Sequence, residues 1–115
     1  MSKINIYLIS AQIGEEKLYK IGFTKRSVEQ RIKDFKTGNA SDFLIEQVFQ
    51  CDKYHITVEK RLHNHFNSKH VNGEWFLLEK NDIYEFVRLC HKYWEETDIL
   101  NNQNTWMLEK NIKFK

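Results

Sequence analysis

Apolar and polar residues alternate at the start of the chain, and this alternation predicts its first element. Aliphatic side chains stand at positions 4, 6 and 8, with polar or aromatic residues between them. Successive side chains of a strand point to opposite faces, so a period of two marks one buried face. The pattern predicts a strand over residues 3–9, with Tyr7 on the face opposite the three aliphatic side chains.

A second strand is predicted over Leu18–Phe23, after a polar stretch that contains a glycine. This stretch, residues 10–17, is typical of a hairpin loop. Lys20 and Gly22 share one face of the second strand. If the two strands pair, Tyr7 and Lys20 become near neighbours on one face of the sheet. Gly22 would leave that face open to close approach by backbone or ligand.

A helical pattern begins after Ser27, a residue type that caps helix N-termini well. Gln30 stands three residues later and completes a capping-box pattern, and we expect the helix to end near Lys36. Its apolar positions recur at spacings of four and three and form one stripe: Val28, Ile32 and Phe35. Arg31 lies beside this stripe, so its side chain should border the core.

Further elements follow from the same reading of the pattern. They are a third strand over Phe43–Cys51, a helix over residues 53–66 and a polar turn over Ser68–Gly73. A short apolar element, an edge strand or an extended segment, follows over residues 74–78. The last helix has Asp82 as its N-cap and Glu85 as the capping-box partner, and it runs to about Glu96. Residues 97–115 are less patterned, and three alternatives remain open for them: a flexible tail, a packed arm or an oligomer contact.

Two polar residues of the predicted helix over residues 53–66 share one edge of its buried face. The buried stripe of this helix is formed by residues four apart: Val58, Leu62 and Phe66. Glu59 and His63 are also four residues apart, one position round from that stripe. They should therefore lie together where the buried face meets the surface.

The size and composition of the chain indicate one globular domain. At 115 residues it can bury a core without staples, and 41% hydrophobic residues exclude an intrinsically disordered chain. The start is too short and too alternating for a signal peptide, and no apolar run approaches the ~20 residues of a membrane helix. Cys51 and Cys90 lack zinc-site spacing and are typical of buried thiols in a reducing compartment. We predict a cytoplasmic α+β protein, with a domain over residues 1–96 and a tail or arm over residues 97–115.

Positive charge is concentrated in the first part of the chain. Residues 1–72 hold twelve Lys and Arg against eight Asp and Glu, whereas residues 73–115 hold six against eight. A basic region favours polyanionic partners. We take the basic side chains in and just before the first helix as candidate nucleic-acid-binding residues: Lys25, Arg26, Lys33 and Lys36.

Four residues of the predicted elements carry groups that phosphodiester hydrolysis needs: Tyr7, Lys20, Arg31 and Glu59. A tyrosine beside a cation can act as a general base, since the positive charge favours the phenolate. An arginine matches phosphate oxygens with two parallel hydrogen bonds. One glutamate with several waters is an ordinary Mg²⁺ site. The set points to metal-assisted cleavage if the elements that carry it converge.

The order of these residues resembles the GIY-YIG nuclease superfamily. The chain has Asn5-Ile6-Tyr7, Lys20-Ile21-Gly22, Arg31 in one helix and Glu59 in the next. Two later motifs are similar to a branch named after a phage open reading frame and a meiotically up-regulated gene: Glu59-x-x-Leu62-His63-x-x-Phe66 and Gly73-Glu74-Trp75-Phe76. In that branch a Lys-Ile-Gly takes the place of the Tyr-Ile-Gly triplet. The resemblance covers roughly residues 4–88.

The resemblance implies a small central three-stranded antiparallel sheet flanked by helices, and Mg²⁺-dependent (or Mn²⁺-dependent) cleavage of nucleic acid, usually DNA. It implies that Tyr7 activates the attacking water, that Lys20 tunes Tyr7 or holds the nucleophile, and that Arg31 stabilises the phosphate. Glu59 would ligate the metal, and His63 would contact phosphate or relay a proton. The chain departs from the family pattern at the second tyrosine, because Lys20 cannot serve as a phenolate.

Other functions fit parts of the same pattern. An inactive nucleic-acid-binding module would use the basic residues without turnover, and a protein-interaction subunit would use the segment Trp106-Met107-Leu108. A zinc site built from three histidines is a further alternative: His63, His65 and His70. Because a nuclease of 115 residues has little surface for sequence recognition, we expect a homodimer, weak specificity or a targeting partner.

Overall fold

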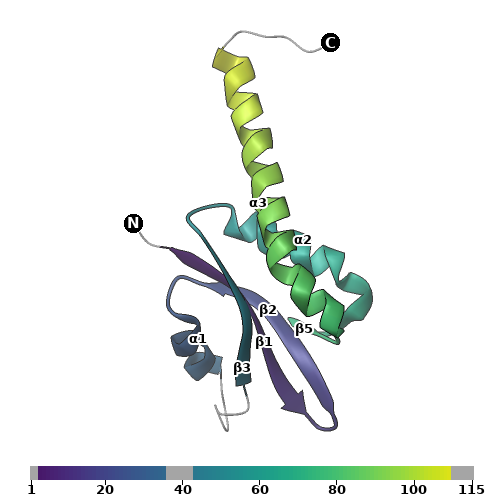
Figure 1. Ribbon diagram of the computed structural model, residues 1–115. Helices are drawn as coiled ribbons and strands as arrows, with labels where there is room; N and C mark the ends of the chain where they lie inside the picture. The colour runs from purple at the N-terminus through teal and green to yellow at the C-terminus, as the bar shows by residue number, and fades with distance from the viewer. Residues whose placement is uncertain (1–2, 36–42, 110–115) are drawn as a thin grey trace.

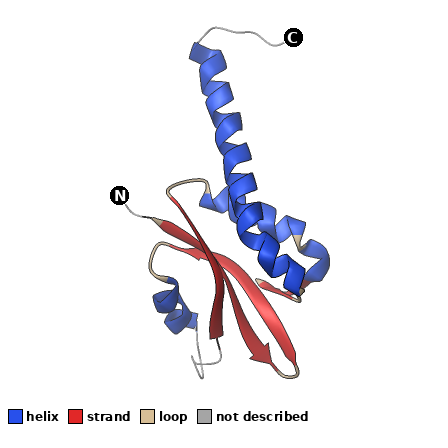
Figure 2. Ribbon diagram, viewed as in Figure 1, coloured by secondary structure: helices blue, strands red, loops and turns tan. Residues whose placement is uncertain are grey.

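A computed structural model describes residues 3–35 and 43–109 and confirms the predicted α+β class (Figure 1). The strands, in chain order, are β1 (Ile4–Ile13), β2 (Glu16–Thr24), β3 (Phe43–Cys51), β4 (His70–Asn72) and β5 (Trp75–Phe76). The helices are α1 (Val28–Phe35), α2 (His55–His65) and α3 (Lys80–Glu109), with a 3₁₀ helix over Asn67–Lys69. The strands form one sheet, and the helices lie outside it (Figure 2).

The sheet is antiparallel, with strand order β3-β1-β2-β5-β4. Its three long strands are the predicted central sheet, and β1 lies in the middle. Two short strands extend the sheet beyond β2, so the prediction of a polar turn over Ser68–Gly73 is wrong. The chain forms β4 there because Gly73, with φ at +57°, reverses it into β5.

The β1–β2 hairpin is longer than the sequence pattern predicts. The loop predicted over residues 10–17 is wrong: β1 continues to Ile13, and β2 begins at Glu16. Only Gly14 and Glu15 form the turn, and Gly14 has a φ of +65° that favours glycine. Polar residues still form this ladder because its hydrogen bonds use backbone atoms, which every residue type supplies.

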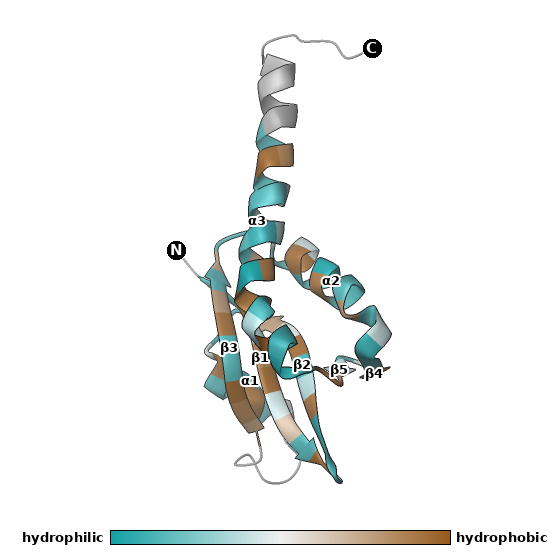
Figure 3. Cartoon of the chain, turned by 45° about the vertical axis from the view of Figure 1, so that its right-hand side comes forward, coloured by the Kyte–Doolittle hydropathy of each residue, from teal (hydrophilic) through white to brown (hydrophobic). Residues whose placement is uncertain are grey.

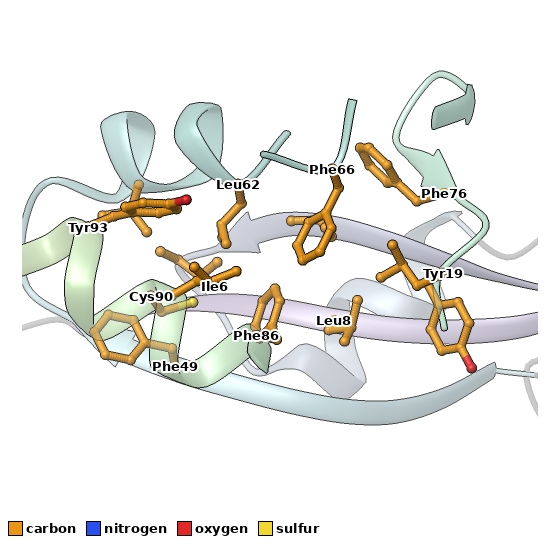
Figure 4. Close-up of a cluster of buried hydrophobic side chains, with 14 of the residues drawn as sticks. Ile6, Leu8, Tyr19, Phe49, Leu62, Phe66, Phe76, Phe86, Cys90 and Tyr93 are labelled. Atoms are coloured by element: carbon orange, nitrogen blue, oxygen red, sulfur yellow. The ribbon is translucent and has the colours of Figure 1, made fainter. Parts of the chain in front are cut away.

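Both faces of β1 are buried, because helices cover the sheet on both sides. On one face α2 and α3 enclose the main core, whose larger side chains include Ile6, Leu8, Tyr19, Leu62, Phe66, Phe76, Phe86 and Tyr93 (Figure 4). On the other face α1 covers a smaller cluster: Tyr7, Ile9, Val28 and Ile32, with Phe43 packed against it. The second cluster removes Tyr7 from solvent.

The helix starts show one confirmed cap and one correction. The Gln30 backbone N–H donates to the Ser27 hydroxyl at 3.1 Å, which confirms Ser27 as the N-cap of α1. Asp82 is not the N-cap of α3, as predicted from the sequence. It lies in the first turn, and its carboxylate accepts from the backbone N–H of Glu79 at 2.8 Å. The helix therefore begins at Lys80, three residues earlier than a cap at Asp82 predicts.

Helix α3 also continues past the predicted end near Glu96, to Glu109. No glycine or proline interrupts this stretch, so nothing in its sequence stops the helix. The part that extends beyond the sheet is mostly hydrophilic in the described residues (Figure 3), with Ile99 and Leu100 as exposed apolar side chains. The division into a domain and a tail at residue 96 stays a prediction.

Candidate active site

Tyr7 lies across Gly22 in the β1–β2 pair and is 1% exposed. A Cβ added at Gly22 would stand 2.5 Å from the Tyr7 hydroxyl oxygen and 2.8 Å from Cζ, so no other residue type fits there without movement. The sequence predicted an open surface beside Gly22. The ring of Tyr7 fills that space instead, because α1 closes over this face.

Arg31 on α1 is the cation that contacts Tyr7. Burial raises the pKa of Tyr7 above its usual 10.0, a hydrogen bond from Arg31 opposes this rise, and the negative charge of Glu74 adds to it. The net pKa shift is upward, so the phenol is protonated at neutral pH. The sequence led us to expect Lys20 as the cation beside the phenol, and the hydrogen bond comes from Arg31.

Lys20 lies on the same face of the sheet as Tyr7, as the alternation predicts. It pairs with Ile9 across β1 and with Trp75 across β5. Its ammonium nitrogen is 3.0 Å from a carboxylate oxygen of Glu74 and 5.4 Å from the centroid of the Trp75 ring. The side chain is 15% exposed, so Lys20 is held between an acidic and an aromatic neighbour.

Helix α2 meets the sheet just before the short strand β5 begins. The backbone N–H of Ile21 donates to the carbonyl of Glu74 at 3.3 Å, and the His63 Nε2 atom lies 2.9 Å from the carbonyl oxygen of Ile21. The side chain of His63 thus lies at the edge of β2, in a position that β5 would occupy if it were longer. This contact holds His63 of α2 against the backbone of β2, at the residue between Lys20 and Gly22.

Glu59 is half-buried and lies 4.0 Å from His63. Burial raises the pKa of the Glu59 carboxyl, the charge of Glu74 raises it further, and His63 opposes the rise. The charges of Glu59 and Glu74 both also raise the pKa of Tyr7. Tyr7, Arg31, Glu59 and Glu74 therefore share one electrostatic environment, and Lys20 joins it through Glu74.

Glu74 is the residue of this cluster that the sequence did not single out as a candidate. It stands in the Gly73-Glu74-Trp75-Phe76 motif, where its neighbours predict an apolar extended segment. Its role depends on the pairing of β5 with β2, which sets Trp75 opposite Lys20. Glu74 immediately precedes the strand whose first residue pairs with Lys20, and this pairing is not visible in one sequence.

The chemistry of these side chains fits a divalent cation. Glu59 supplies hard carboxylate oxygens, and a cation there would favour the charged carboxylate against the burial and the Glu74 charge that raise its pKa. In the described part of the chain no group of three or more His, Cys, Asp or Glu side chains could hold a metal ion. A cation held by Glu59 would therefore keep most of its ligands as water.

The histidines of the zinc alternative contact separate partners. His65 Nδ1 lies 3.2 Å from the Tyr93 hydroxyl, and His70 Nε2 lies 2.6 Å from the carbonyl of Gly73. His63 contacts Ile21 instead. These three imidazoles do not form one site in the structure.

The candidate nucleic-acid-binding residues lie around α1. Lys25 and Lys33 are exposed, and exposed Arg26 forms an ion pair with Asp34. The side chain of Asn5 donates to the carbonyl of Arg26 at 2.9 Å and fixes this loop. Lys36 lies outside the described residues.

Comparison with known proteins places the chain in a family. The model of the T5orf172 domain matches residues 4–91, which include every element from β1 to the first third of α3. No curated protein and no solved structure matches. The structure also contains, in its described residues, no helix that is long and apolar enough to cross a membrane. Because the match covers most of the sequence, the chain belongs to the T5orf172 domain family.

Proposed function

We propose that this protein is a metal-dependent endonuclease of the GIY-YIG type that hydrolyses phosphodiester bonds, with DNA as its substrate. The observation that carries the proposal is the buried Tyr7–Arg31 hydrogen bond beside the half-buried carboxylate of Glu59. These residues come from three different elements: β1, α1 and α2. Packing of a hydrophobic core does not need a phenol, a guanidinium and a carboxylate near one another, so their arrangement favours a role in chemistry. The family match supports a role in nucleic-acid chemistry.

Each side chain has a task in this proposal. Arg31 binds non-bridging phosphate oxygens through its planar guanidinium. Tyr7, as the phenolate, accepts the proton of the attacking water, whose oxygen forms the new bond to phosphorus as the bond to the leaving oxygen breaks. His63 supplies the proton to the leaving oxygen or binds phosphate. Glu59 would hold a Mg²⁺ or Mn²⁺ ion, which would supply positive charge to stabilise the transition state.

Because the pKa of Tyr7 is raised, deprotonation of its phenol is the most difficult step of the proposed reaction. Burial disfavours the phenolate, and Arg31 already lowers the pKa from what burial alone would give. Positive charge brought to Glu59 would cancel an anion that now raises the Tyr7 pKa. The proposal thus requires that Glu59 and Tyr7 act together.

The test is cleavage of supercoiled plasmid with Mg²⁺ or Mn²⁺, with EDTA as the metal-free control. Glu59→Gln keeps the shape of the side chain and removes its charge. Glu95→Gln makes the same change at an exposed position of α3 and is the matched control. We expect metal-dependent nicking by the wild type and the Glu95→Gln variant, and its loss in Glu59→Gln. Undiminished cleavage by Glu59→Gln would remove Glu59 from the mechanism.

A second candidate function is nucleic-acid binding without turnover. The observation that favours it is the ion pair of Lys20, the residue in place of the family's second tyrosine, with Glu74. Such a module would bind DNA with an affinity that falls as salt rises, and no metal would produce cleavage. Binding that does not respond to salt would exclude it. A cytoplasmic location and a homodimer or targeting partner stay predictions.

A further inference from the structure

We propose that Glu74 is a positioning residue for Lys20 and an opposing charge that limits how tightly the site binds phosphate. This inference deepens the proposed function and rests on it. It assigns a role to the acidic residue of the Gly73-Glu74-Trp75-Phe76 motif, which the proposed chemistry does not use.

The backbone of Glu74 is held in place by the residues just before and just after it. Gly73, with φ at +57°, turns the chain just before it, and the Glu74 carbonyl accepts the N–H of Ile21 at 3.3 Å. The next residue, Trp75, pairs directly with Lys20 across the two strands. Because the backbone is anchored to β2 on either side of Lys20, the Glu74 carboxylate has little freedom to leave it.

The side chain of Lys20 needs such a partner. It is 15% exposed, and a largely buried ammonium is costly unless it is paired. Glu74 provides the charge at 3.0 Å, and the Trp75 ring at 5.4 Å provides a face that favours a cation. Two contacts from adjacent residues of one strand thus hold the ammonium toward the face that carries Tyr7.

The charge of Glu74 also acts on the rest of the site. Glu74 lies 3.0 Å from Lys20, whose side chain is on the face of the sheet that carries Tyr7, so the negative charge of Glu74 stands at the edge of the proposed phosphate site. A carboxylate at that range repels a phosphodiester, so the position that orders Lys20 also weakens substrate affinity. The repulsion weakens substrate binding, whereas the positioning of Lys20 favours turnover. Separate measurements of binding and of turnover therefore distinguish the two effects.

The first measurement is a ¹H–¹⁵N correlation spectrum of the lysine ammonium groups, because an ion pair slows exchange of the ammonium hydrogens with water. We expect a resolved Lys20 signal in the wild type, assigned by its loss in Lys20→Arg, and loss of the same signal in Glu74→Gln. Glu79→Gln is the control. It removes a glutamate that pairs with Lys69 at 3.6 Å and is 80% exposed, outside the site. Absence of the Lys20 signal in the wild type, or its persistence in Glu74→Gln, overturns the positioning role.

The second measurement is binding of a fluorescent DNA duplex in EDTA, followed by anisotropy. We expect Glu74→Gln to bind about three- to tenfold more tightly than the wild type, and Glu79→Gln to bind within about twofold of it. Glu74→Asp keeps the charge and should bind like the wild type. Equal binding by all four proteins, or an equal gain in Glu79→Gln, overturns the opposing-charge role.

The third measurement is steady-state cleavage with Mg²⁺. We expect Glu74→Gln to lower both kcat and KM, with kcat falling about tenfold because Lys20 is no longer held. A structural defect would instead raise KM or reduce the folded fraction. If the wild type does not cleave DNA, the proposed function fails, and the first two measurements still decide the roles of Glu74. If Glu74→Gln does not fold, the wild-type spectrum and DNA binding by Glu74→Asp decide the roles of Glu74.

Discussion

Gly22 and Tyr7 face each other across the β1–β2 pair, and the Tyr7 ring lies over the position that a side chain at residue 22 would occupy. Adding a methyl group by Gly22→Ala would place Cβ 2.5 Å from the Tyr7 hydroxyl oxygen. We expect this variant to lose about 1–3 kcal/mol of unfolding free energy in urea titration, because a packed site accepts extra volume poorly. The matched control is Gly22→Ala in a Tyr7→Val background, where the clash is absent and the cost should largely disappear.

We expect Tyr7 to lower the free energy of unfolding at alkaline pH. Its folded-state pKa is raised above 10.0, so the neutral phenol is favoured by folding. Its contribution is fully present below pH 10 and is lost as pH rises through the folded pKa. Urea unfolding at pH 8 to 11 should show a steeper loss in the wild type than in Tyr7→Phe. Parallel curves for the two proteins would contradict the burial effect.

Removing Arg31 should raise the pKa of Tyr7 further. Arg31 donates the hydrogen bond that opposes the burial effect, and its charge acts in the same direction. In Arg31→Met, which keeps much of the aliphatic length, the ¹³Cζ resonance of Tyr7 should titrate at higher pH than in the wild type. Arg88→Met on the exposed face of α3 provides the comparison and should leave that titration unchanged.

Divalent metal should stabilise the wild type and not Glu59→Gln. A ligand that binds only the folded state adds about 2.7 kcal/mol at a hundredfold excess over its Kd. We expect Tm to rise with Mg²⁺ in the wild type and in Glu95→Gln, and to stay constant in Glu59→Gln. An equal rise in Glu59→Gln would show that the ion binds elsewhere.

Leu62 links the core to the position of the α2 edge that carries Glu59 and His63. It is fully buried, whereas Ile56 on the same helix is 62% exposed. Leu62→Ala should lower the free energy of unfolding by about 2–5 kcal/mol in chemical denaturation. Ile56→Ala should change it by no more than about 0.5 kcal/mol. Because Glu59 and His63 are on this helix, the first variant should also reduce cleavage. Equal costs at the two positions would contradict the observed packing of α2.

Lys33 should contribute to DNA binding through its charge. It is exposed on α1, and Lys92 is an exposed lysine on α3 that serves as its control. Lys33→Gln should weaken binding at low salt and reduce the slope of log K against log salt by about 0.9, the value for one phosphate contact. The control substitution, Lys92→Gln, should leave that slope unchanged. Identical slopes for Lys33→Gln and the wild type would remove Lys33 from the interface.

The sequence alone determined most of the local structure. The limits of β3 matched Phe43–Cys51, the Ser27 cap was correct, and the buried stripe of α2 fell on Val58, Leu62 and Phe66. These features depend on periodicity and on contacts between near neighbours, which a single sequence records. The limits of the hairpin, of β4 and of α3 were missed, because backbone pairing and helix continuation do not need an apolar pattern.

The tertiary structure decided how the site is connected. The residue types of Tyr7, Arg31 and Glu59 were visible in the sequence, and so was the face that Tyr7 and Lys20 share. The tertiary structure decided that Arg31 contacts the phenol and that the phenol covers Gly22, because α1 packs on β1. It also decided that Lys20 pairs with Glu74, because β5 pairs with β2. Contacts between residues far apart in sequence depend on which elements pack together. Periodicity tells which face of an element is buried, but not which partner buries it.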